Sequence, residues 1–171
     1  MPPIEFKAPW SRSLRLFTGV ATLLLCLVVL GGLMSGTRLT LGWRLGLVGI
    51  PLIILVSAIC TFIRGYAITE DEILIRQLGW TKHLPLRTLK SIDGKADAME
   101  RSIRIVANGG IFSFTGFFWN RQLKFYRAYA SDPTRAVVLR YPNKTIVITP
   151  HDPQHFIVRT RTLMKIGQAW R

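Results

Sequence analysis

The sequence predicts a hydrophobic helical hairpin followed by a mainly-β domain, and two observations support this division. The first is a pair of uncharged apolar segments at residues 16–34 and 45–63. The second is a change of composition after residue 63: the rest of the chain holds 18 of the 23 lysines and arginines and eight of the nine acidic residues. A chain with 49% hydrophobic residues and a formal net charge of +14 is therefore split into an apolar part and a basic part.

The two apolar segments are long enough to cross a bilayer. A helix rises about 1.5 Å per residue, so each segment spans roughly 28 Å, close to the hydrocarbon thickness. Two buried helices of a soluble protein are a poorer interpretation, because such helices seldom stay apolar on every face. A cleaved signal peptide fits the first segment poorly, since the segment exceeds a typical signal core and no clear A-x-A site follows. We therefore expect a multi-pass membrane protein.

The connection SGTRLTLGWR at residues 35–44 is short, so the two helices should form an antiparallel hairpin with both ends on one side. Lysine and arginine flank that side more often than they occur in the connection, which predicts cytoplasmic termini. The basic residues counted are Lys7, Arg12 and Arg15 in the amino-terminal flank (residues 1–15), Arg64, Arg76 and Lys82 after the second segment, and Arg38 and Arg44 between.

The two cysteines, Cys26 and Cys60, lie inside the apolar segments. They can form neither a secretory disulfide framework nor a zinc site, so they are interpreted as apolar filler.

Residues 64–171 show the pattern of short strands separated by turn residues. The expected strands cover residues 66–69, 73–77, 80–84, 102–107, 123–130, 135–141 and 145–149. The expected turns include Glu70–Glu72, Gly79, Asn108–Gly110 and Asp132–Pro133, and residues 86–92 read as a loop or a short helical turn. After Pro153 the apolar residues recur at helical spacing. The prediction is an antiparallel barrel or sandwich of about seven strands, closed by a carboxy-terminal helix.

The segment HDPQH places His151 and His155 four residues apart, with Asp152 between them. This spacing fits a metal or catalytic site, but it also fits the start of a helix. Proline suits the first helical turn, and aspartate before it suits the N-cap position. We expect Asp152 to cap a helix beginning at Pro153, with His151 before the helix and no metal site.

Three segments carry a resemblance to a known family: GYAITEDEILIR, FTGFFWNRQLKFYRAYASDPTRAVVLRY and TIVITPHDPQHFI. Together with the two apolar segments, they resemble the bacterial pleckstrin-homology (PH)-like membrane proteins over about residues 65–160. The resemblance implies two roughly orthogonal sheets with a carboxy-terminal helix, but no defined activity. One departure is Lys124, where relatives often have glycine at the start of the long strand.

Eukaryotic domains of this shape often bind phosphoinositides through a basic loop between their first two strands. The matching loop here is Glu70-Asp71-Glu72. Three carboxylates repel phosphate, so this binding mode is not expected.

Basic residues are the clearest candidates for a binding surface. They are Arg87, Lys90 and Lys95 in one loop-like region, and Arg121, Lys124 and Arg127 beside the FFWN segment. An anionic cytoplasmic leaflet attracts such residues by about 1 kcal/mol each. The alternative, a solvated basic face without a ligand, remains open. The adjacent Phe117, Phe118 and Trp119 are expected in the core, with an anchor at the membrane interface as the alternative.

These observations favour a non-catalytic, membrane-anchored binding or scaffolding module at the cytoplasmic face of the bacterial inner membrane. Its expected partners are the bilayer, anionic lipid headgroups, other membrane proteins or a second copy of itself, and no cofactor is expected. The alternative is a structural subunit of a membrane complex, because Gly31, Gly32, Gly36, Gly42, Gly46 and Gly49 permit close helix approach. Nucleic-acid binding lacks a recognition motif despite the sequence pI of about 10.9. An enzyme using His151, Asp152 and His155 is the weakest alternative.

Overall fold

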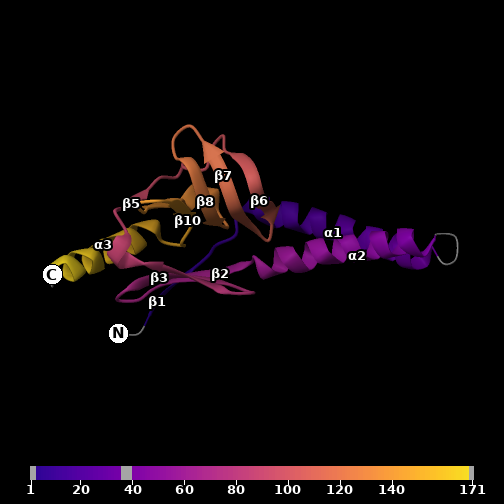
Figure 1. Cartoon of the computed structure of the whole chain (residues 1–171), viewed down its shortest axis with the longest axis horizontal. Helices are drawn as coiled ribbons and strands as arrows, with labels where there is room; N and C mark the ends of the chain where they lie inside the picture. The colour runs from indigo at the N-terminus through magenta and orange to yellow at the C-terminus, as the bar shows by residue number, and fades with distance from the viewer. Residues whose placement is uncertain (1–2, 36–39, 170–171) are drawn as a thin grey trace.

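The computed structural model describes residues 3–35 and 40–169 and shows a helical hairpin that projects from one side of a β domain (Figure 1). Helix α1 comprises Arg12–Met34, and helix α2 comprises Leu41–Cys60. Both are long and apolar enough to cross a membrane, judged by length and composition. Two residues of the connection on which predictions rest, Gly36 and Arg38, lie outside the described part of the chain.

The helix boundaries differ from the predicted segments 16–34 and 45–63. Helix α1 starts earlier, at Arg12, because the hydroxyl of Ser11 accepts a hydrogen bond from the Leu14 N–H at 3.1 Å and caps the helix. Helix α2 starts earlier too, at Leu41, and it ends at Cys60. Ile63 is excluded from the helix because it already pairs with Gln77 in a β-sheet.

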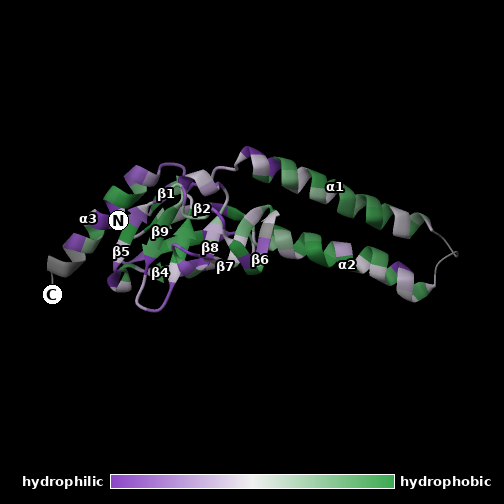
Figure 2. Cartoon of the chain, turned by 90° about the horizontal axis from the view of Figure 1, so that it is seen from above, coloured by the Kyte–Doolittle hydropathy of each residue, from purple (hydrophilic) through white to green (hydrophobic). Residues whose placement is uncertain are grey.

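The hairpin helices expose most of their apolar side chains. In each helix only 11% of the most hydrophobic window is buried, and the hydrophobic colour follows both helices along their length (Figure 2). A helix in the core of a soluble fold would be largely buried, so this exposure indicates an apolar environment outside the described chain. The two helices touch closely at Gly32, where an added Cβ would lie 3.0 Å from the Leu47 side chain.

The β domain consists of two sheets and a carboxy-terminal helix. The first sheet has the strand order β1-β2-β3-β4, all antiparallel. The second has the order β5-β9-β10-β8-β7-β6. The strands are β1 (Ile4–Lys7), β2 (Ile63–Ile68), β3 (Glu72–Gln77), β4 (Thr81–Pro85), β5 (Ser91–Gly94), β6 (Ile103–Ile111), β7 (Ser113–Asn120), β8 (Lys124–Ala130), β9 (Val137–Arg140) and β10 (Thr145–Ile148); helix α3 is Pro153–Ala169, and two 3₁₀ turns are η2 (Leu86–Thr88) and η3 (Pro133–Arg135).

The prediction of an antiparallel barrel or sandwich of about seven strands, closed by a carboxy-terminal helix, is confirmed for the mainly-β domain and the helix, but the structure differs from it in three respects. Ten strands are present among the described residues, the two sheets share no strand pairing, so the barrel is not closed, and β10 runs parallel to β8. The strands β1, β5 and β7 were not predicted. β1 and β5 are only four residues long, and the aromatic run in β7 hides the alternation of a strand.

The predicted turn at Asn108–Gly110 was also wrong, because these residues lie within β6. The register shifts between Gly109 and Ile111, as in a β-bulge. The Asn108 side chain stabilises this irregularity: its amide nitrogen donates to the Ile111 carbonyl at 2.7 Å, and its oxygen accepts from the Ile111 N–H at 3.2 Å. The chain reverses at Phe112, which has φ 63°.

Alternate residues of the second sheet pack on its two sides. Ile146 and Ile148 join the main core between the sheets, whereas Val147 joins a second cluster with Phe118 and Tyr126. The buried Tyr66 links the sheets, because its hydroxyl donates to the Tyr129 carbonyl at 2.8 Å.

The hairpin and the β domain are joined by hydrogen bonds rather than by a free linker. The buried Thr18 hydroxyl donates to the Gly110 carbonyl at 3.1 Å and accepts from the Phe112 N–H at 3.0 Å. At the end of α2, the Thr61 carbonyl accepts from the side chains of Gln77 at 2.9 Å and Ser113 at 3.1 Å. These contacts fix the orientation of the domain relative to both helices.

Candidate functional site

The first predicted basic group is divided by the structure. Arg87 lies in η2 and pairs with Asp71 at 3.2 Å, with both side chains exposed. Lys95 is half-buried just after β5. Of these three residues, Lys90 alone lines the cleft beside α3, together with the Arg161 and Lys165 side chains of α3. Arg87, Lys90 and Lys95 therefore do not converge on one cleft.

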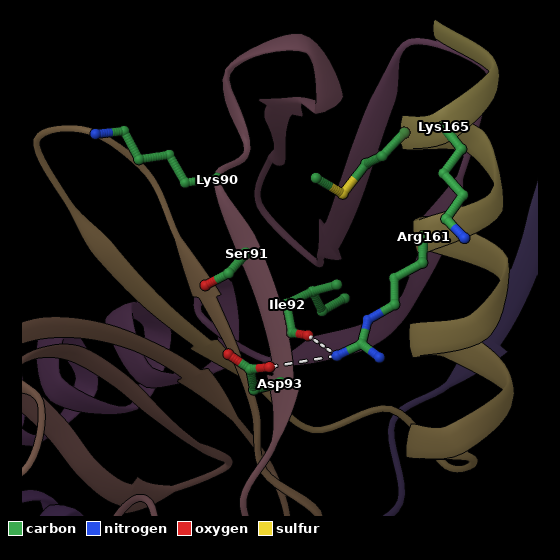
Figure 3. Close-up of a pocket in the computed structure, with 7 residues that line it drawn as sticks. Lys90, Ser91, Ile92, Asp93, Arg161 and Lys165 are labelled. Carbon is green, nitrogen blue, oxygen red and sulfur yellow. Dashed lines mark hydrogen bonds and ion pairs between the residues drawn. The ribbon is translucent and has the colours of Figure 1, made fainter. Parts of the chain in front are cut away.

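The cleft beside α3 has a volume of about 250 Å³. Figure 3 shows that Arg161 reaches across it to β5, where its guanidinium donates to the Ile92 carbonyl at 2.8 Å and to Asp93 at 3.3 Å. The Lys90 side chain points away from α3 (Figure 3). Because Arg161 is already engaged, its contacts chiefly hold α3 against the edge strand β5.

The acidic turn between β2 and β3 is held by side-chain contacts. Besides the Asp71–Arg87 pair, the Glu72 carboxylate lies 2.7 Å from Nδ1 of His83. These contacts tie the turn to β4 and η2. The carboxylates therefore have a structural role at the position where phosphoinositide binding would require a basic loop.

The second predicted basic group is divided as well. Arg121 is exposed in the turn between β7 and β8, and Lys124 is exposed at the start of β8. Lys124 has φ 59°, a left-handed conformation that glycine adopts without strain. A backbone shape that suits glycine is thus present here with a lysine.

Arg127 differs from the other five predicted basic residues because it lines a second cleft, on the open side of the sandwich. This cleft has a volume of about 310 Å³ and lies between β4, β7, β8 and the start of β10. Lys82 and Lys144 contribute two further cations to its lining, and no acidic residue lines it. Lys82 and Lys144 were not among the predicted binding residues, because Lys82 lies in β4 and Lys144 in the turn before β10, both separated from Arg127 in the chain.

Two aromatic rings hold the Arg127 guanidinium. Its central carbon lies 5.1 Å from the ring centroid of Phe117 and 5.1 Å from that of Tyr129. The Arg127 Nε atom is buried and has no hydrogen-bond partner among the described residues, and the Tyr129 hydroxyl is in the same situation. Burial raises the pKa of Tyr129, with a smaller opposing effect from the Arg127 charge.

The aromatic segment 117–119 is only partly core. Phe118 is 3% exposed and stacks on Tyr126, whereas Phe117 and Trp119 are 36% and 37% exposed. They are exposed because side chains alternate across β7. The expectation of a core position was therefore right for Phe118 and wrong for its two neighbours. The ring of Phe117 stacks on Phe125 at 5.4 Å, and Trp119 lies opposite Phe125 in the strand register.

The HDPQH segment forms the start of α3. The Asp152 carboxylate accepts from the His155 N–H at 3.0 Å, and the helix begins at Pro153. His151 precedes the helix, and the His155 ring packs 5.5 Å from the ring of Phe6 in β1. Within the described ranges, no group of three histidine, cysteine or acidic side chains is placed to hold a metal ion.

The fold and the clefts define a small β-domain of the ligand- or protein-binding type, carried on two hydrophobic helices. Residues 64–163 match the family model of the bacterial PH domain, and the chain belongs to this family. Domains of this family are generally binding modules rather than enzymes. No curated protein and no solved structure gave a match to the chain.

Proposed function

We propose that this protein is a non-catalytic binding module, anchored in the bacterial inner membrane by α1 and α2, which engages anionic lipid headgroups or protein partners at the cytoplasmic face. The observation that carries this proposal is the docking of a PH domain on the ends of two exposed apolar helices through Thr18 and Thr61. Docking of this kind fixes the position of the domain relative to both helices.

The basic surface supplies the attraction for lipid. Arg121 and Lys124 are exposed beside the exposed ring of Trp119. Tryptophan and arginine side chains favour the headgroup region, and each cation near an anionic leaflet contributes about 1 kcal/mol. Because the helices already hold the domain at the membrane, this attraction would orient the domain rather than recruit it.

Hydrogen–deuterium exchange of the full-length protein in nanodiscs tests the lipid interaction. A fragment starting near residue 65 would be a poor substitute, since it lacks β1, which pairs with β2. We expect slower exchange in the β7–β8 segment when phosphatidylglycerol is added to phosphatidylcholine nanodiscs, and loss of this effect at high salt. Identical exchange in both lipids would exclude the lipid interaction and leave protein partners, which a cross-linked pull-down of the full-length protein would identify.

The predicted topology requires its own test. A reporter fused to the carboxy terminus is expected to be active only in the cytoplasm, because the helical hairpin places both ends on the basic side. Activity of the reporter on the outer side of the membrane would contradict this orientation.

A structural subunit of a membrane complex is the second candidate function. Gly42 and Gly46 are spaced four residues apart on α2, and an added Cβ at either would meet nothing within 4 Å. Such an open surface fits the close approach of a partner helix. Gly46→Leu is expected to abolish cross-linking to that partner while keeping the fold; unchanged cross-linking would argue against helix packing through this face.

A further inference from the structure

The cleft on the open side of the sandwich combines three features that do not occur together at the exposed basic residues. Its lining carries three cations, Lys82, Arg127 and Lys144, without a compensating acid. It contains buried polar groups with no partner in the described chain. Its walls include the aromatic rings of Phe117 and Phe125, which stack at 5.4 Å.

The charge of the cleft favours the binding of an anion. Cations gathered in a recess with low-dielectric walls focus the electrostatic potential and concentrate anions. Some other arginines of the domain are balanced locally: Arg87 pairs with Asp71, and Arg161 pairs with Asp93. Arg127 has aromatic rings in place of a carboxylate.

The position of Arg127 is organised in advance. The rings of Phe117 and Tyr129 hold its guanidinium by cation–π contacts. A side chain that is already ordered loses less conformational entropy when it binds a ligand. Buried donors without partners are rare in folded proteins, so the unpaired Nε–H of Arg127 marks a guanidinium whose hydrogen bonding is incomplete among the described residues.

We propose that this cleft binds an organic anion in which a phosphate or carboxylate group is attached to an apolar or aromatic body. The anionic group would contact Arg127, Lys82 and Lys144, and the apolar body would pack on Phe117 and Phe125. This inference rests on the proposed binding function and names the site.

Two sources could supply such an anion: a lipid headgroup of the adjacent leaflet, or a soluble metabolite. The cleft lies close to the end of α2, because the Gly79 N–H donates to the Cys60 carbonyl at 3.1 Å and Lys82 follows Gly79 by three residues. At about 3.3 Å per residue, Lys82 is roughly 10 Å beyond this contact. Such proximity makes the headgroup region accessible to the cleft, while its open side admits a soluble ligand.

Binding of phenyl phosphate to the full-length protein in phosphatidylcholine nanodiscs, followed by saturation-transfer difference NMR, tests the inference. We expect phenyl phosphate to bind more tightly than inorganic phosphate or phenol. Arg127→Met should weaken binding by about tenfold to a hundredfold, as expected for the loss of one charged hydrogen-bonding group. The matched control is Arg104→Met, an exposed arginine of β6 outside the cleft, which should leave the affinity unchanged.

A second variant protects the test against misfolding of Arg127→Met. The double variant Lys82→Gln/Lys144→Gln changes only outer cations of the cleft and should also weaken binding. Absence of phenyl phosphate binding to the unaltered protein, or equal binding to the Arg127→Met variant, would overturn the inference.

The lipid composition identifies the source of the anion. If phosphatidylglycerol in the nanodisc competes with phenyl phosphate, the ligand is a lipid headgroup; if phenyl phosphate binds equally in both lipids, the ligand is soluble. Either result supports the binding of an organic anion in the cleft. Salt-sensitive protection of the β7–β8 segment that persists without any phenyl phosphate binding would retain the proposed function and reject the site.

Discussion

The hydroxyl of Tyr66 is expected to contribute more to stability than its size suggests, because it joins the two sheets. It donates to the Tyr129 carbonyl at 2.8 Å in β8 and accepts from the Thr149 N–H at 3.2 Å after β10. Tyr66→Phe keeps the ring in the core but leaves a buried carbonyl and a buried N–H without this partner. Each unpaired buried group costs about 1–3 kcal/mol, so we expect a loss of about 3 kcal/mol.

A urea titration of the full-length protein in nanodiscs, followed by tryptophan fluorescence, measures this loss. Tyr141→Phe is the matched control, because the Tyr141 hydroxyl is buried without a hydrogen-bond partner in the described structure. Removal of this hydroxyl should leave the free energy of unfolding unchanged or raise it, since an unpaired buried group is lost and no hydrogen bond is broken. If Tyr66→Phe costs no more than Tyr141→Phe, the link between the sheets does not stabilise the domain.

The pH dependence gives an independent check on the same residue. Burial raises the pKa of Tyr66 from 10.0 to about 12, with opposing hydrogen bonds from Thr149 and Ser131. As the pH rises, Tyr66 therefore ionises at a lower pH in the unfolded chain than in the folded protein. The neutral Tyr66 hydroxyl contributes its full stabilisation below pH 10, and this contribution declines between pH 10 and about pH 12. The decline amounts to about 3 kcal/mol. The stability difference between the unaltered protein and Tyr66→Phe should narrow over this range; a constant difference would contradict the assigned environment.

Three further substitutions test local features by the same urea titration. Asp152→Ala should lower stability by about 1 kcal/mol through loss of the helix cap, and zinc should leave the melting temperature unchanged, whereas a large zinc-dependent stabilisation would restore the metal-site interpretation. Lys124→Gly should raise stability by about 1 kcal/mol, because φ 59° strains a residue with a Cβ; a loss would mean that the lysine side chain makes a compensating contact. Gly116→Ala should lower stability by more than about 3 kcal/mol, because φ is 138° and the added Cβ would lie 2.4 Å from the Ala107 Cα. A variant of unchanged stability would show that the backbone of β6 shifts to accommodate the methyl group.

The sequence was sufficient for the elements whose signal is local. The apolar segments are long and uncharged, and β3 and β10 each carry a run of β-branched and apolar residues bounded by turns, so periodicity and length identified them. Strand β1 could not be identified in this way. Its four residues, Ile4–Lys7, lie in a basic flank, and their pairing with β2 depends on contacts across the whole hairpin.

The candidate cleft was only partly predictable for the same reason. Arg127 was identified by its charge, but every exposed arginine gives the same signal. What distinguishes it is the position of its neighbours: Lys82 comes from one sheet and Lys144 from a turn of the other. Their convergence follows from the packing of two sheets that do not close, which short-range patterns do not encode.

In the proposed arrangement, the rigid junction between the hairpin and the β domain holds the open cleft at a fixed distance from the bilayer. A domain on a flexible linker samples many distances from the bilayer, and an anion site on it would meet lipid only occasionally. Here Thr18 is buried in a contact with β6, and the turn that leads into β4 is bonded to the end of α2. The height of Lys82 above the membrane is therefore set by the fold. If the anion is a lipid headgroup, it binds without further ordering of the domain, and weakening the junction at Thr18 should reduce lipid binding while leaving the affinity for a soluble anion unchanged.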